Sequence, residues 1–198
     1  MRRMHRWLAP LMLAVVVACQ PQAEADAEAQ ATEEQPGTPE SKIENATAAA
    51  PASISDDATV MDWPATEGGE PTELRAGTNG WTCMPDNPAI AGNDAMCLDG
   101  PWLAWGQAYM SKTEPSVEGL GISYMLTSSA EGSNTDPFAT AETADNEWHK
   151  NGPHIMLLVP DASLLEGLPT DAHNGGPYVM WKGTPYVHVM VPTTEPIM

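Results

Sequence analysis

The fold class is decided by the stretch YVMWKGTPYVHVMV, residues 178–191. β-Branched and aromatic residues stand on both sides of a central Gly-Thr-Pro, a pattern that predicts two antiparallel strands joined by a turn. If Lys182 pairs with Tyr186 across this turn, Met180 lies opposite His188. The stretch therefore predicts a β-hairpin that brings a methionine and a histidine together.

Further elements are predicted upstream of the hairpin. Residues 153–159 form a predicted strand, because aliphatic side chains recur there at every second position. A buried strand is predicted at residues 121–126, and a helix at residues 101–110 with Asp99 at the N-cap position. The order of strands and helices predicts an α+β domain with a mainly antiparallel sheet and one or two helices.

The N-terminus has the pattern of an export signal. Three arginines precede an apolar run at residues 7–18 that is too short to span a bilayer. The run ends in Val-Val-Ala-Cys, which resembles the lipobox of bacterial lipoproteins. The resemblance implies that residues 1–18 are a cleaved signal peptide and that Cys19 is acylated. A plain signal peptide with a coincidental cysteine is the alternative.

Acylation of Cys19 implies a cell-envelope protein whose lipid anchor makes the membrane a partner. Gln20 follows the cysteine, and by resemblance to lipoprotein sorting in enteric bacteria it favours the outer membrane, facing the periplasm. The chain has 27 acidic residues against 8 Lys and Arg, a formal net charge of −19. Nucleic-acid binding is excluded, because phosphate groups would be repelled. No protein or small-molecule partner follows from the sequence.

Residues 19–54 are rich in Ala, Glu, Gln, Thr and Pro. From Gln20 to about Ala52 they contain one large aliphatic residue, Ile43, and no aromatic residue, so they bury too little apolar surface to offset the entropy of ordering. This composition predicts a disordered acidic tether. A single α+β domain is then expected at residues 55–198.

Cys83 and Cys97 remain as an even pair once Cys19 is lipidated. In an exported protein this predicts a disulfide, with a reactive Cys83 as the alternative. The intervening loop carries Asp86, Asn87 and other oxygen-bearing side chains, which favour turns over a calcium site because they lack the EF-hand spacing.

Five segments of the predicted domain form a recognisable pattern: TNGWTCMP (78–85), MCLD (96–99), SNTDP (133–137), GPHIM (152–156) and GTPY (183–186). Together they resemble secreted bacterial proteins of unknown function. The resemblance implies no activity.

Two His-x-Met units stand in predicted strands, His154 with Met156 and His188 with Met190. Residues i and i+2 of a strand point to the same face, and the hairpin adds Met180 as a third thioether. Imidazole and thioether groups suit copper, especially Cu(I), so these five residues are a candidate copper site. The alternative is that all five are ordinary half-buried core residues.

No hydrolase, P-loop or dinucleotide-binding motif is present. A hydrolase would have to draw on the loop at 128–134 and on His149, while Trp102, Trp105 and Tyr109 are either a ring-binding surface or helix core. We therefore expect a binding or interaction module without catalytic activity. A copper-binding lipoprotein and a hydrolase are the alternatives, and no other cofactor is indicated.

Overall fold

The computed structural model describes residues 37–66 and 68–194. The predicted signal peptide at residues 1–18 and the lipidation at Cys19 lie outside these residues.

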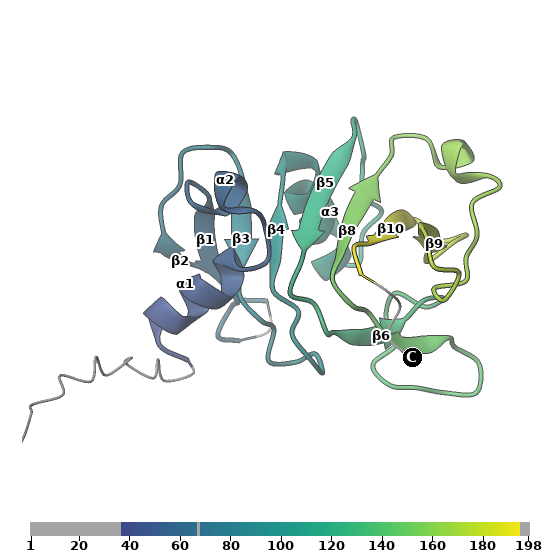
Figure 1. Cartoon of the computed structure of the whole chain (residues 1–198), viewed down its shortest axis with the longest axis horizontal. Coiled ribbons are helices and arrows are strands. Elements are labelled where there is room, and N and C mark those ends of the chain that lie inside the picture. Colours follow the sequence, from purple (N-terminus) through teal and green to yellow (C-terminus); the bar gives the residue numbers. More distant parts are fainter. Residues whose placement is uncertain (1–36, 67, 195–198) are drawn as a thin grey trace, which may run out of the picture. The chain divides into compact units, whose positions relative to one another are not determined.

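Eight strands form one sheet in the order β2-β1-β3-β4-β5-β8-β10-β9 (Figure 1). Only β1 and β3 pair in parallel within it, and the other neighbours are antiparallel. The predicted α+β fold with a mainly antiparallel sheet is confirmed. The strands of this sheet are β1 (Thr59–Asp62), β2 (Thr72–Arg75), β3 (Thr82–Met84), β4 (Met96–Leu98), β5 (Gly121–Met125), β8 (His154–Leu158), β9 (Tyr178–Met180) and β10 (His188–Pro192). A second, two-stranded sheet consists of β6 (Glu131–Ser133) and β7 (Trp148–Lys150).

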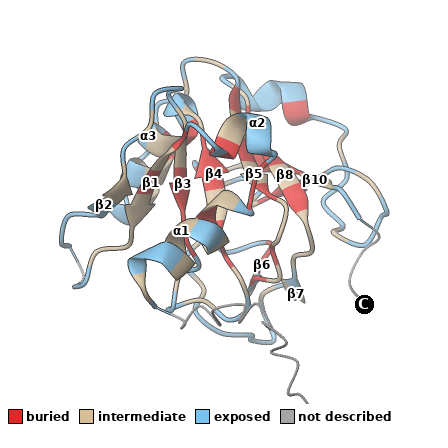
Figure 2. Cartoon of the chain, turned by 60° about the vertical axis from the view of Figure 1, so that its left-hand side comes forward, coloured by how far each residue is buried: buried red, intermediate tan, exposed pale blue. Residues whose placement is uncertain are grey.

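Within the described residues, three α-helices accompany the sheet, where one or two were expected. They are α1 (Pro39–Thr47), α2 (Ala52–Ser55) and α3 (Gly100–Met110), and a 3₁₀ turn, η1, spans Ala162–Leu165. In β4, Cys97 packs with α1 and its neighbour Leu98 packs with α3. Because consecutive strand residues face opposite ways, α1 and α3 cover opposite faces of the sheet. Figure 2 shows the buried residues concentrated on the central strands.

The Asp99 carboxylate fixes the position of α3. Its Oδ1 accepts a hydrogen bond from the Trp102 backbone N–H at 3.0 Å, which confirms the predicted N-cap. Its Oδ2 accepts a second one from the Ile122 N–H of β5 at 2.6 Å. One side chain therefore caps the helix and ties it to the sheet.

The prediction of a disordered tether over residues 19–54 is wrong for its last part. Thr38 caps α1 by accepting from the Ser41 N–H at 3.2 Å, and Lys42 forms an ion pair with Asp62 at 2.6 Å. Ala46 and Ala49 are fully buried. Small alanines bury little area each but allow a helix to approach the sheet closely, which a count of large aliphatic residues does not detect. The folded domain therefore includes residues 37–54.

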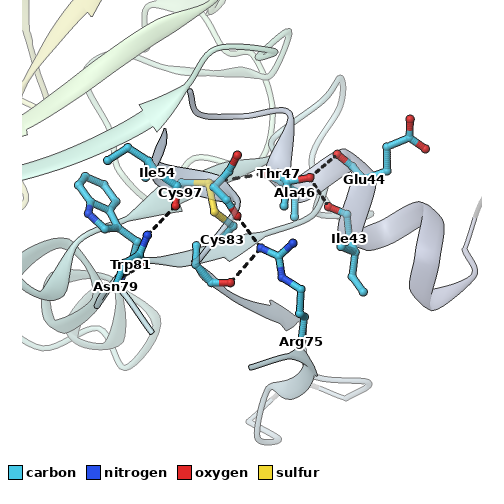
Figure 3. The surroundings of a disulfide bond; sticks show 12 residues. Ile43, Glu44, Ala46, Thr47, Ile54, Arg75, Asn79, Trp81, Cys83 and Cys97 are labelled. Carbon is cyan, nitrogen blue, oxygen red and sulfur yellow. Dashed lines mark hydrogen bonds between the residues drawn. A yellow bond between two sulfur atoms is a disulfide. The ribbon is translucent and has the colours of Figure 1, made fainter. Parts of the chain in front are cut away.

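Ala46 packs beside the predicted disulfide, which is present. Cys83 and Cys97 are direct cross-strand partners on β3 and β4, with an S–S distance of 2.00 Å. The Cys97 sulfur lies 3.5 Å from the Ala46 carbonyl oxygen, as Figure 3 shows. The Arg75 guanidinium donates to the carbonyls of Ser55 and Ala58 nearby. The disulfide thus joins two strands beneath α1.

Candidate metal centre

The register of four neighbouring strands places the His-x-Met residues. The hairpin pairs His188 with Met180, as the sequence predicted. On the next strand pair, Met190 of β10 lies opposite Met156 of β8. All these side chains point to the sheet face that α3 covers, since directly paired residues share a face.

A methionine not predicted from the sequence completes the arrangement. Met125 of β5 lies directly opposite His154 of β8. His154 therefore has one methionine across the strand and another, Met156, two residues along its own strand. His188 stands in the same relation to Met180 and Met190. We call these the His154 set (Met125, His154, Met156) and the His188 set (Met180, His188, Met190).

The two sets are related by an approximate two-fold axis through the Met156–Met190 pair. A half-turn about that axis exchanges β8 with β10 and β5 with β9, and so exchanges His154 with His188 and Met125 with Met180. The sheet face therefore carries two sets of one imidazole and two thioethers, joined at their centre.

A single five-residue copper site requires both imidazoles to reach one ion. The register of β8 and β10 does not allow this. Two antiparallel His-x-Met units paired at their methionines place their histidines at opposite ends. His154 and His188 are separated by four residue positions along the strands, about 13 Å. The Met156–Met190 pair lies between them. The register therefore gives two three-residue sets, each of one histidine and two methionines, in place of one shared site.

Both imidazoles are held in the same protonation state. Nδ1 of His154 lies 2.6 Å from the Gly152 carbonyl oxygen, and Nδ1 of His188 lies 3.0 Å from that of Tyr186. A carbonyl oxygen only accepts, so each Nδ1 carries the proton. Burial lowers the pKa of each imidazole to about 4, which keeps both rings neutral at pH 7.

The other ring nitrogen of each histidine, Nε2, is unprotonated and carries a free lone pair. Nε2 of His154 and Nε2 of His188 are buried and have no hydrogen-bond partner. An unpaired buried acceptor costs free energy. A neutral imidazole whose Nδ1–H is anchored on a backbone carbonyl is the form in which histidine ligates metals through Nε2.

Aromatic rings enclose the His188 set. The rings of Trp102, Trp105 and Trp181 lie edge-on to His188, with centroid distances of 5.4, 5.7 and 5.0 Å. Trp102 and Trp105 are core residues of α3, only 2% and 6% exposed, so the ring-binding surface considered from the sequence is not present. They shield the His188 set from water.

The His154 set lies closer to solvent. A hollow of about 30 Å³, room for one or two waters or an ion, is lined by His149, His154, His173, Tyr178 and Met190 among others. In its wall, Nε2 of His149 lies 2.9 Å from Oδ1 of Asn151, and the Tyr178 hydroxyl donates to the same oxygen at 3.0 Å. The hollow connects the surface to one end of the His–Met array.

The described residues do not assemble the hydrolase machinery considered from the sequence. The Ser128 hydroxyl donates to the Asn151 carbonyl, the Ser133 hydroxyl accepts from Thr135 and Asp136 N–H groups, and no serine of the loop bonds to His149. These hydroxyls stabilise turns. Within the described ranges, no group of three or more His, Cys, Asp or Glu side chains is placed to hold a metal ion. The two His–Met sets therefore stay the candidate metal ligands among the described residues.

Comparison with known proteins adds no assignment. No family model, curated protein or solved structure matches the chain. Within the part of the chain that the structure describes, none of the helices combines the length and apolarity needed to cross a bilayer.

Proposed function

We propose that this protein is a non-catalytic Cu(I)-binding module of the cell envelope, with the His154 set and the His188 set as its ligands. One observation carries the proposal. Each set presents a buried, unprotonated imidazole Nε2 without a partner, on the same sheet face as its two methionines.

The chemistry of the donors favours Cu(I) over other metals. One imidazole and two thioethers form a soft, uncharged ligand set, whereas zinc sites use thiolate, imidazole and carboxylate, and calcium sites use oxygen. Burying a single positive charge among neutral ligands also costs less than burying a double one. The indole cover excludes water, which favours the reduced ion at the His188 set.

A lipid anchor would fix this activity at a membrane. We propose that Cys19 is acylated and holds the domain in the cell envelope, with the outer membrane facing the periplasm favoured by Gln20. The Cys83–Cys97 disulfide suits an oxidising compartment. Intact-mass analysis and detergent partitioning test the anchor: the Cys19→Ser protein should leave the detergent phase. A Cys19→Ser protein that stays membrane-bound contradicts it.

Anaerobic titration of the protein with Cu(I), in competition with a chromophoric chelator, tests metal binding. We expect two equivalents per chain, and one after the double change Met125→Leu and Met156→Leu. Leucine conserves methionine's volume at a cost of about 1.5 kcal/mol or less, so the fold should survive. Met110→Leu is the matched control, because Met110 is 64% exposed and lies outside the array. Absence of Cu(I) binding, or equal binding in all three proteins, overturns the proposal.

A further inference from the structure

We infer that His149 and His173, the mouth pair, capture Cu(I) at the surface and pass it to the His154 set. The inference rests on the proposed function and adds a site outside both ligand sets. It concerns how the ion reaches its ligands, which the two sets alone do not explain because all six of their side chains are buried.

The mouth pair comes from separate segments that meet at the hollow. His149 belongs to β7, and His173 belongs to the loop before β9. Their ring centroids lie 5.9 Å apart with the planes at 70°. Two imidazoles that share one metal ion at about 2 Å per nitrogen have their centroids at a similar separation. The separation of the two rings therefore allows one ion to pass between them, bound transiently.

The ring nitrogens of the pair are arranged for capture. The Asn151 amide oxygen accepts a hydrogen bond from Nε2–H of His149. Nδ1 of His149 is then unprotonated, and its lone pair can bind a metal ion. Nδ1 of His173 lies 3.6 Å from the Asp171 carboxylate at the exposed rim. This carboxylate, in a protein of net charge −19, raises the local concentration of cations.

The hollow links this pair to the buried ligands. His149, His173, His154 and Met190 all line the same space of about 30 Å³. An ion leaving the mouth pair meets His154 of one set and Met190 of the other. Met190 belongs to the His188 set and is the cross-strand partner of Met156, which belongs to the His154 set. An ion at Met190 is therefore next to ligands of both sets. The His154 set, which is nearer the hollow, should fill first.

Stopped-flow transfer of Cu(I) from a chromophoric chelator to the full protein tests the inference, with the absorbance of the chelator as the readout. We expect the double change His149→Gln and His173→Gln to slow loading at least ten-fold while equilibrium affinity stays within three-fold of wild type. Lys150→Gln is the control, because Lys150 lines the same hollow and is not a Cu(I) ligand. The exposed His173→Gln change alone should also slow loading, and it avoids any effect of the half-buried His149 on folding.

The outcomes separate the two proposals. Loading of the double variant at the wild-type rate overturns the mouth pair and leaves the proposed function intact. A parallel fall in rate and affinity also overturns it, because the two histidines would then be ligands of the final site. A wild-type protein that binds no Cu(I) overturns both.

Discussion

Met156 and Met190 are direct cross-strand partners at the midpoint between His154 and His188. Each methionine lies two residues from the histidine of its own strand, so the pair makes two sets of ligands continuous. The arrangement follows from strand direction: antiparallel pairing turns one His-x-Met unit around relative to the other. The same pairing that separates the imidazoles brings the thioethers together.

Replacement of Met190 by leucine should weaken the His188 set and spare the His154 set. Leucine fills the same volume but offers no thioether, so we expect the stability to fall by about 1.5 kcal/mol or less. Chelator competition should show one equivalent of Cu(I) retained and the other bound at least ten-fold more weakly. Two equivalents at unchanged affinity would remove Met190 from the ligands.

The two buried histidines should make stability depend on pH. Their folded-state pKa values, about 4, lie below the value of 6.5 for the free side chain, so the unfolded chain takes up protons first. Their contribution to the free energy of unfolding is therefore lost as the pH falls from 6.5 towards 4. Each proton corresponds to about 1.4 kcal/mol per pH unit within that window.

Urea unfolding of the His188→Gln protein between pH 7 and pH 4.5 checks this contribution. The free energy of unfolding should depend less steeply on pH in this variant than in the wild type, by the slope that corresponds to about one proton. Burial raises the pKa of Asp94 into the same pH range, but Asp94 is present in both proteins, so its contribution cancels in the comparison. Parallel profiles would mean that His188 is not a buried neutral imidazole.

We expect Asp94 to destabilise the fold at neutral and alkaline pH. Burial, and then the charge of Asp86, raise the pKa of Asp94 to about 7 from 3.8. Because the folded-state pKa is the higher one, the stabilising contribution of the protonated carboxyl is lost as the pH rises from 3.8 through 7. Asp94→Asn should therefore raise the free energy of unfolding at pH 8 by at most about 4 kcal/mol. The gain should vanish near pH 4, and an equal gain at both pH values would contradict it.

Loss of the disulfide should destabilise the domain without unfolding the sheet. Cys83 and Cys97 are 14 residues apart, and closing a loop of about 15 residues stabilises by roughly 3 kcal/mol in the chain-entropy model. Urea unfolding of the Cys83→Ala, Cys97→Ala protein should show this loss. Thiol labelling of the unreduced, denatured wild type should find neither cysteine free, and labelling of both would refute the bond.

The sequence predicted the features that depend on residues close together in the chain. The sequence predicted the hairpin register that pairs Met180 with His188, although residues 181–187 form a longer connection than the Gly-Thr-Pro turn, and it predicted the N-cap of α3 at Asp99. The partner of His154 could not be predicted in this way. Met125 stands in a correctly predicted strand, but its pairing with β8 spans some thirty residues of intervening chain, which no local pattern specifies.

Two other differences have equally physical causes. The segment around Ala46 contains few large apolar residues, and the sequence therefore predicted disorder there. In the structure it packs closely against the disulfide, and Ala46 and Ala49 are fully buried. The shared copper site is not formed because β8 and β10 run in opposite directions. Residue spacing placed the His-x-Met units on one face, but only the register of β8 against β10 sets the two histidines at opposite ends.

X-ray absorption spectroscopy of the Cu(I)-loaded protein tests the central claim most directly, because it identifies the atoms around the ion. We expect a shell of about one nitrogen and two sulfur neighbours per copper in the wild type and in Met110→Leu. The Met125→Leu, Met156→Leu protein should show the same shell around half as much copper, because its remaining ion is bound by the intact His188 set. A shell of nitrogen and oxygen alone would place the copper at surface histidines and contradict the account.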